Sequence, residues 1–136
     1  MANTKNAEVV LTTKNYLAEV KTRNHFLVID EPVASGGDNN GPTPVEYLLT
    51  AVGGCVSITL RMYAERKGWD VGKITVNVFQ KEALTLKGIK KWLEEEISFE
   101  KDITEDQRKR LLVIAGKCPV AKMIKGTTEI QSKINQ

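Results

Sequence analysis

The fold is decided by residues 43–68, which read TPVEYLLTAVGGCVSITLRMYAERKG. Thr43 can accept hydrogen bonds from the first N–H groups of a helix, Pro44 loses no hydrogen bond at the first helical position, and Glu46 can reach back to the Thr43 N–H. The closing glycine is a typical stop signal. The stretch therefore predicts a helix over residues 44–67, about 36 Å long at 1.5 Å per residue, which must run through the middle of the fold.

Two adjacent glycines lie inside this predicted helix. Gly53 and Gly54 each cost about 1 kcal/mol relative to alanine in a helix interior, so we expect a neighbouring backbone to approach the helix closely there. The longest uncharged run, residues 47–60, is shorter than the roughly 20 residues that span a bilayer. It favours a buried core helix over a membrane anchor.

The segment before the helix has the pattern of a small sheet. Loose alternation of apolar and polar residues predicts three strands of an antiparallel meander, over residues 8–16, 16–20 and 26–29. Turns are expected at residues 14–15 and 21–24, and a loop rich in Gly and Asn at 34–41.

The segment after the helix contains both strands and helices. Three further strands are predicted, over residues 73–79, 92–99 and 127–134. A long loop is expected at residues 83–91. Thr104 begins a second capping motif that leads into a helix over residues 108–116, and Cys118-Pro119 begins a short helix.

Composition supports a single globular domain. The chain has 136 residues, of which 41% are hydrophobic and 27% charged, with a net charge of +3. A chain of this size buries enough surface to form a core without metals or disulfides. We therefore expect one domain over residues 1–136. The slight positive charge predicts no nucleic-acid partner.

The first residues suggest a cytoplasmic protein. No apolar segment follows Lys5, so we expect no secretory signal, no membrane partner and a cytoplasmic location. In the cytosol, cysteines are more often catalytic or redox-sensing than structural. The chain has two of them and no Cys-x-x-Cys pair, and its single histidine is His25, so we expect no metal site.

The two cysteines occupy different kinds of position. Cys55 lies in the middle of the predicted helix, on a face shared with Val52 and Met62, where a cysteine usually acts as a small hydrophobe. Cys118 directly precedes Pro119, at the N-cap of the short helix, where the helix dipole favours a thiolate and is expected to lower its pKa. Packing and redox chemistry both stay open for these residues.

A reactive thiol needs a neighbouring cation. A thiol that attacks a peroxide must be held as a thiolate, and arginine suits this role because it stays charged when partly buried. Arg108 and Arg110 are expected on a solvated helix face, and Arg66 lies about 16 Å along the helix from Cys55. Arg23, in a predicted turn between strands, could approach from another element and is our first choice.

Two blocks of motifs resemble a known family. The first block holds Gly36-Gly37, Gly41-Pro42-Thr43-Pro44 and Gly53-Gly54-Cys55 and continues through residues 59–68; the second runs from Cys118-Pro119-Val120 through residues 127–130. In this order and spacing they resemble the OsmC/Ohr family of osmotically inducible and organic hydroperoxide resistance proteins. The resemblance extends from about Phe26 to the C-terminus.

The resemblance implies a fold and a chemistry. The fold would be OsmC-like and α+β, with antiparallel sheets around long central helices and two chains intertwined as a homodimer. Cys55 would be the peroxidatic thiolate that an organic hydroperoxide oxidises to a sulfenic acid, and Cys118 the resolving thiol that condenses it to a disulfide. No bound cofactor is expected, since an external dithiol, a lipoyl group in the hydroperoxide-resistance branch, restores the thiols.

The chain departs from the peroxidase branch of that family at two positions. The branch has a glutamate directly after the proline that opens the long helix, where this chain has Val45. Glu46 follows one step later, on the helix face opposite Cys55, so a capping role is favoured over a catalytic one. The catalytic arginine of the branch has no clear counterpart, because Arg23 sits differently relative to the following strand.

Two functions of different classes follow from these residues. The first is a cytoplasmic, homodimeric, cysteine-based peroxidase that reduces organic hydroperoxides in oxidative-stress defence, with Cys55, Cys118, Arg23 and Glu46 as candidate site residues. The alternative is an OsmC-like dimer that binds a small apolar or acyl ligand, senses redox state or serves as an interaction dimer, without peroxidase turnover.

Overall fold

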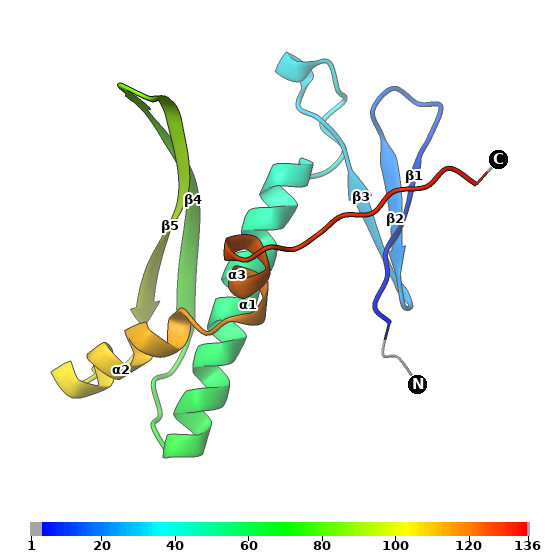
Figure 1. Ribbon diagram of the computed structural model, residues 1–136. Helices are drawn as coiled ribbons and strands as arrows, with labels where there is room; N and C mark the ends of the chain where they lie inside the picture. The colour runs from blue at the N-terminus through cyan, green and yellow to red at the C-terminus, as the bar shows by residue number, and fades with distance from the viewer. Residues whose placement is uncertain (1–3, 136) are drawn as a thin grey trace. The chain divides into compact units, whose positions relative to one another are not determined.

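A computed structural model describes residues 4–135 and combines helices with antiparallel sheets (Figure 1). The predicted α+β class is therefore confirmed. The chain divides into two compact units, Met1–Leu48 and Leu49–Gln136, and helix α1 (Pro44–Lys67) begins in the first and continues into the second. The expectation of one domain over residues 1–136 stays a prediction.

The first unit contains a three-stranded antiparallel sheet. Strands β1 (Glu8–Leu11), β2 (Ala18–Thr22) and β3 (His25–Ile29) pair in the order β1-β2-β3, which confirms the predicted meander. The β2–β3 turn places Arg23 at a φ of 51°, in the left-handed region that non-glycine residues rarely adopt. Arg23 is exposed there, as a turn residue should be.

A buried carboxylate organises the loop that follows β3. Asp30 accepts hydrogen bonds from the backbone N–H of Glu31 (2.8 Å) and of Asn40 (3.0 Å), and so joins the two ends of a segment that includes the short helix η1 (Val33–Ser35). The hydrogen bond from the Asn40 N–H is the main reason that the pKa of Asp30 lies below its ordinary value. Gly37 fits this loop because a Cβ there would lie 2.0 Å from the Glu31 carbonyl oxygen.

Helix α1 begins with the predicted capping box. The Glu46 N–H donates to Thr43 Oγ1 (3.1 Å), and the Thr43 N–H donates to Glu46 Oε1 (2.9 Å). At the other end Gly68 has a φ of 71°, which a glycine adopts at little cost. Both ends of the helix therefore lie where the sequence predicts them.

The second unit contains a long β-hairpin, drawn beside α1 in Figure 1. Its strands β4 (Ile74–Thr85) and β5 (Gly88–Phe99) pair along their whole length, with only Leu86 and Lys87 between them. The long loop predicted at residues 83–91 is therefore wrong. The hairpin beyond residue 80 is exposed on both faces, so its strands show no burial pattern and depend on backbone pairing.

Two shorter helices complete the second unit. Helix α2 (Glu105–Ala115) starts at a capping box between Thr104 and Gln107, and α3 (Pro119–Lys125) starts at Cys118, as predicted. The strand predicted over residues 127–134 is wrong: residues 127–135 form no strand, and Ile130 is 90% exposed. An alternating segment becomes a strand only when another strand pairs with it, and none of the described strands does.

The core of the second unit forms around α1. Its buried members come from α1, α2 and the start of α3: Val52, Val56, Leu60, Tyr63, Leu111, Ile114, Ala115, Cys118 and Ala121. The predicted close approach holds at Gly53, where a Cβ would lie 3.3 Å from Val78 Cγ2 and 3.5 Å from the Val76 carbonyl oxygen. It is wrong at Gly54, where no other element of the described chain comes within 4 Å of the position of a Cβ.

Helix α1 is also long and apolar enough to cross a membrane, judged by length and composition. This is weak support for a membrane span, since the central helix of a soluble protein meets the same criteria. Val52, Val56 and Leu60 on this helix are fully covered by the rest of the chain. One side of α1 is therefore packed in the core of the second unit, whereas most of the helix surface is not buried by the described chain.

Candidate active site

The structure places the two cysteine side chains against each other. Cys55 lies in the middle of α1 and is partly buried, whereas Cys118 is 0% exposed in the core. Both are free thiols, and the Cys55 side chain lies close enough to Cys118 to raise its pKa. Residues far apart in sequence thus form one dithiol pair.

Cys118 is held by the helix that follows it. Its Sγ accepts a hydrogen bond from the Ala121 N–H at 3.4 Å, so the thiol caps the first turn of α3. The pKa of Cys118 is nevertheless raised, first by burial and then by the neighbouring Cys55 side chain, and these effects outweigh the N–H groups of Ala121 and Val120. The predicted lowering of this pKa is therefore wrong, because removing the thiol from water disfavours the charged form.

The pair is chemically asymmetric. Burial first, and then the neighbouring Cys55 side chain, raise the pKa of Cys118, so the neutral thiol is favoured there. Cys55 is also the more accessible of the two thiols. The geometry offers a buried, protonated thiol next to a thiol that a reagent can reach.

The five arginines differ in whether their side chains contact another residue of the described chain. Four have partners within the second unit: Arg61 donates to the Gly72 carbonyl, Arg66 lies over the Tyr63 ring, Arg108 pairs with Glu105, and Arg110 donates to Tyr63 Oη. Arg23, in the first unit, has no side-chain partner among residues 4–135. Of the five arginines, Arg23 is therefore the one whose charge is not used in a contact within the described chain.

The other predicted residues lie at the start of α1 and in the first sheet. Glu46 is engaged in the capping box with Thr43, and Val45 beside it is exposed. His25 is exposed at the start of β3, and no three His, Cys, Asp or Glu side chains converge within residues 4–135. The pairing that the structure shows is that of the two cysteines, and the roles of Arg23 and Glu46 stay predictions.

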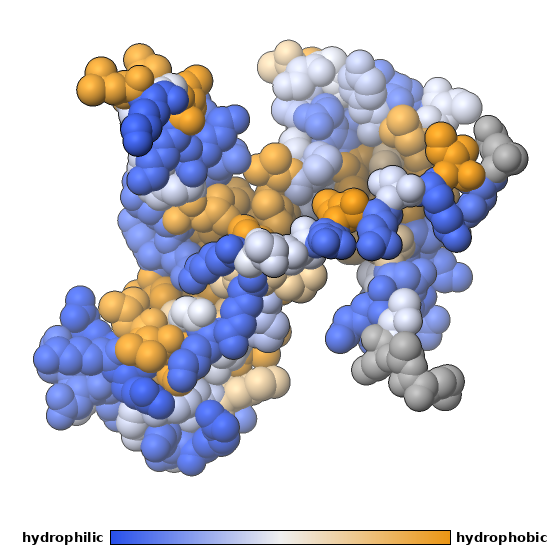
Figure 2. Space-filling model, viewed as in Figure 1, coloured by the Kyte–Doolittle hydropathy of each residue, from blue (hydrophilic) through white to orange (hydrophobic). Residues whose placement is uncertain are grey.

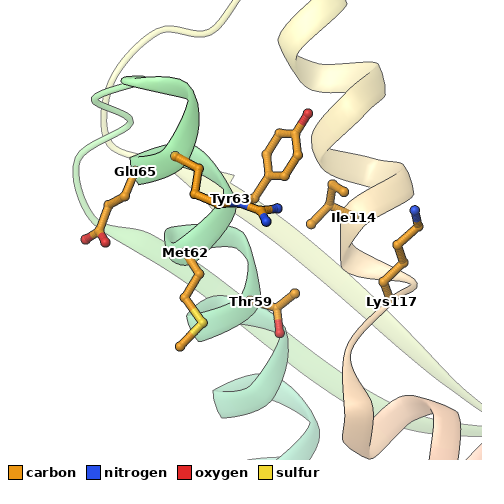
Figure 3. Close-up of a pocket in the computed structure, with 7 residues that line it drawn as sticks. Thr59, Met62, Tyr63, Glu65, Ile114 and Lys117 are labelled. Atoms are coloured by element: carbon orange, nitrogen blue, oxygen red, sulfur yellow. The ribbon is translucent and has the colours of Figure 1, made fainter.

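A groove that the sequence did not predict opens along α1, one helical turn from Cys55. It measures about 660 Å³ and is lined by Thr59, Met62, Tyr63, Glu65, Arg66, Ile114 and Lys117. Figure 3 shows the α1 residues on one side and Ile114 and Lys117, from α2 and the residues after it, on the other. The helical spacing of Thr59, Met62 and Arg66 could have indicated the α1 side, whereas the α2 side depends on tertiary packing.

Solved structures show the same fold at low sequence identity. An OsmC-like protein from Mycoplasma pneumoniae has a TM-score of 0.70 and 19% identity, over 93% of this chain and 90% of that chain. An organic hydroperoxide resistance protein OsmC from Legionella pneumophila has a TM-score of 0.69 and 18% identity, over 93% and 92%. An organic hydroperoxide resistance protein from Elizabethkingia anophelis, with thiocyanate bound, has a TM-score of 0.70 and 18% identity, over 93% and 91%.

Sequence comparison agrees with these structural relatives. No curated protein matches it. Residues 37–133, however, match the family model of OsmC-like proteins, and this segment includes α1, the β4–β5 hairpin and both cysteines. Because the match covers well over half of the chain, the protein belongs to the OsmC/Ohr family of OsmC-like proteins.

Proposed function

We propose that this protein is a thiol-dependent peroxidase that reduces organic hydroperoxides through Cys55 and Cys118. The observation that carries the proposal is that Cys55, which is partly exposed, lies beside the fully buried Cys118 and helps to raise its pKa. Structural relatives named as organic hydroperoxide resistance proteins support the same chemistry. The proposed location is the cytoplasm.

The reaction has three balanced steps. The Cys55 thiolate attacks the outer peroxide oxygen, the O–O bond breaks, Cys55 becomes a sulfenic acid, and the alkoxide takes a proton to leave as an alcohol. The Cys118 sulfur then attacks the Cys55 sulfur, and the sulfenic oxygen leaves as water with the Cys118 proton. Finally an external dithiol, which we expect to be of lipoyl type, exchanges with the disulfide and leaves as its own disulfide.

The arrangement of the thiols suits these steps. The first thiol must meet the substrate, and Cys55 is the accessible one. The second must stay protonated until the sulfenic acid forms, and burial keeps the proton on Cys118 by raising its pKa. Arg23 is the proposed activating cation, the role that the sequence predicts for it, since an arginine stays charged when partly buried.

We propose further that the active form is a homodimer. On α1, Ile58 is 57% exposed and Met62 is 63% exposed, a large apolar area for a core helix. Figure 2 shows a second apolar surface at the tip of the β4–β5 hairpin, where Leu84, Leu86 and Ile89 are exposed. Contiguous apolar surface of this kind marks an interface, and a second copy would cover it.

The test of the peroxidase is intact mass after one equivalent of an alkyl hydroperoxide. We expect the wild type to lose two hydrogens as the disulfide forms, and Cys118→Ser to gain one oxygen on Cys55. Cys55→Ser is expected to stay unmodified. With dihydrolipoamide present, the wild type should turn over. Unmodified thiols in the wild type would overturn the proposal.

One observation favours a second function. Val45 stands where the peroxidase branch is expected to carry a glutamate, and Glu46 is engaged in the helix cap. An OsmC-like dimer that binds an apolar or acyl ligand in an open groove, without turnover, fits these residues. The same mass experiment separates the two functions, because the binding protein would leave both thiols reduced.

A further inference from the structure

Glu95 interrupts an apolar row on strand β5. Side chains alternate between the two faces of a strand, so Glu95 shares one face with Leu93, Ile97 and Phe99. These three apolar side chains pack against the core of the second unit. Glu95 is exposed and makes no ion pair among residues 4–135. Packing alone therefore does not account for a carboxylate at this position.

The face that carries Glu95 is directed toward α1. Across the hairpin, Glu95 is paired with Val78, and directly paired residues lie on the same face. A Cβ at Gly53 of α1 would lie 3.3 Å from Val78 Cγ2, so this face contacts the helix. The adjacent Glu94 and Glu96 lie on the opposite face. Of these three glutamates, Glu95 is the one on the core side of the hairpin.

Glu95 lines two cavities beside α1. The larger measures about 380 Å³, and its other lining residues are Val52, Leu93, Ala121, Ile124 and Lys125. The smaller measures about 140 Å³ and is also lined by Leu60 and Arg108. Lys125 of α3 and Arg108 of α2 are the other charged side chains that line them. The larger cavity has room for several water molecules, each of which occupies about 30 Å³ in the liquid, and Glu95 and Lys125 give them polar partners.

The larger cavity adjoins the two cysteines. Ala121 forms part of its wall and donates its N–H to Cys118 Sγ at 3.4 Å. Val52, also in the wall, precedes Cys55 by nearly one helical turn and packs in the same core cluster as Cys118. The Glu95 carboxylate therefore faces, across one cavity, the residues that cover the thiols.

The resolving step needs a group that accepts a proton. Cys118 is fully buried, and burial and the Cys55 side chain raise the pKa of its thiol, so it still holds its proton when the sulfenic acid forms. A thiol attacks as its thiolate, so this proton must leave as the S–S bond forms. The core cluster around Cys118 is apolar apart from the Tyr63 hydroxyl. Glu95 is the carboxylate that lines the cavity next to this cluster.

We propose that Glu95 accepts the Cys118 proton in the resolving step, through water in the larger cavity. The Cys118 sulfur attacks the Cys55 sulfur as the S–O bond of the sulfenic acid breaks, so the Cys118 sulfur is oxidised and the Cys55 sulfur is reduced. The proton passes to the Glu95 carboxylate and then to the departing oxygen, which leaves as water. Glu95 returns to its carboxylate form, and no further reactant is consumed. The inference rests on the proposed function, because it assigns one step of the same reaction.

The first experiment separates the two oxidation steps in time. After mixing with one equivalent of cumene hydroperoxide, dimedone would be added at set times, and intact mass would report the sulfenic acid and the disulfide. We expect Glu95→Gln to form the sulfenic acid at the wild-type rate and to close the disulfide about a hundredfold more slowly, as for the loss of a positioned general base. Glu96→Gln, on the opposite face of β5, is the matched control and should close the disulfide as the wild type does. Wild-type closure in a folded Glu95→Gln protein would overturn the proposal.

The pH profile of disulfide closure distinguishes proton transfer from a structural role. In the wild type the rate should vary little between pH 6 and pH 8, because carboxylates are in general ionised there. In Glu95→Gln it should rise about tenfold per pH unit, since attack then depends on the fraction of Cys118 that has lost its proton to solvent. Glu95→Asp keeps the carboxylate and should restore most of the rate. A steep profile in the wild type, or a slow but flat one in Glu95→Gln, would overturn the proposal.

The last experiment needs no peroxide. Diamide adds to the Cys55 thiolate, and Cys118 then displaces the hydrazine product from the Cys55 sulfur, so that the same disulfide forms and the Cys118 proton leaves on the hydrazine. Glu95→Gln should slow this displacement too. If peroxide oxidises Cys55 and Glu95→Gln closes the disulfide normally, the Glu95 proposal fails and the peroxidase stands. If Cys55 is inert to peroxide but diamide closure is slow in Glu95→Gln, the peroxidase fails and Glu95 stands as the proton acceptor.

Discussion

Cys118 lies beside Cys55 of α1, and its Sγ accepts a hydrogen bond from the Ala121 N–H at 3.4 Å. One buried sulfur therefore connects the middle of α1 to the first turn of α3. Any chemistry that changes the Cys118 sulfur also changes the cap of α3. Because burial raises the pKa of Cys118, this thiol holds its proton more tightly in the folded protein than in the unfolded chain.

This relationship predicts how stability depends on pH. The pKa of Cys118 is raised above its ordinary value of 9.0 by burial and by Cys55, so the folded state retains a proton that the unfolded chain releases. The stabilisation is complete below the unfolded-state pKa and is lost as pH rises from that value through the folded-state pKa. Urea unfolding should show wild-type stability falling between pH 8 and pH 10 more steeply than that of Cys118→Ala.

Alkylation gives an independent check of the same prediction. With limiting iodoacetamide at neutral pH, Cys55 should be modified before Cys118, as peptide mapping would show. Equal rates at the two thiols, or identical pH profiles for the wild type and Cys118→Ala, would contradict the assignment of Cys118 as the buried, protonated partner.

The loop closed by Asp30 yields a prediction about stability. Gly37→Ala would place a Cβ 2.0 Å from the Glu31 carbonyl oxygen, so the backbone must move and the hydrogen bonds to Asp30 must weaken. We expect a loss of roughly 2 kcal/mol in the free energy of unfolding. Ser35→Ala, in the same loop and exposed, should be neutral. A stable Gly37→Ala protein would show that this close approach is not required.

Local signals in the sequence predicted the helix ends well. Thr43 with Glu46, and Thr104 with Gln107, form the capping boxes that the sequence suggests. Capping depends on residues three positions apart, so it can be predicted without the fold. The strands of the first sheet could be predicted for a similar reason. Short turns connect them, and each strand pairs with its neighbour in the sequence.

Features that depend on tertiary structure could not be predicted from the sequence. The hairpin continues beyond residue 80 with both faces exposed, so no alternation marks it, and residues 127–134 alternate but find no partner strand. The sign of the Cys118 pKa shift was missed because burial is set by α1 and α2, which pack over it, whereas the sequence shows only its helix cap. The groove needs both helices in place for the same reason.

One substitution can distinguish a capping role of Glu46 from a catalytic role. Glu46→Gln keeps an oxygen that can accept the Thr43 N–H, so the capping box should survive and the free energy of unfolding should change by less than about 0.5 kcal/mol. If the residue is a cap, kcat/KM for cumene hydroperoxide should stay within a few fold of the wild type.

The companion variant tests the cap itself. Thr43→Ala removes the acceptor of the Glu46 N–H and should cost about 1 kcal/mol in unfolding free energy. A large loss of kcat in a stable Glu46→Gln protein would instead assign a catalytic role to this carboxylate.

Arg23 offers the sharpest test of the activating cation. Its φ of 51° is a conformation that asparagine tolerates well, so Arg23→Asn removes the charge without straining the turn. We expect unchanged or slightly higher stability and a fall of about a hundredfold in kcat/KM for cumene hydroperoxide, because the developing charge on the peroxide loses its cation. Arg108→Gln, which removes an exposed charge from α2, is the matched control and should keep full activity. Full activity in Arg23→Asn would show that another group holds the Cys55 thiolate.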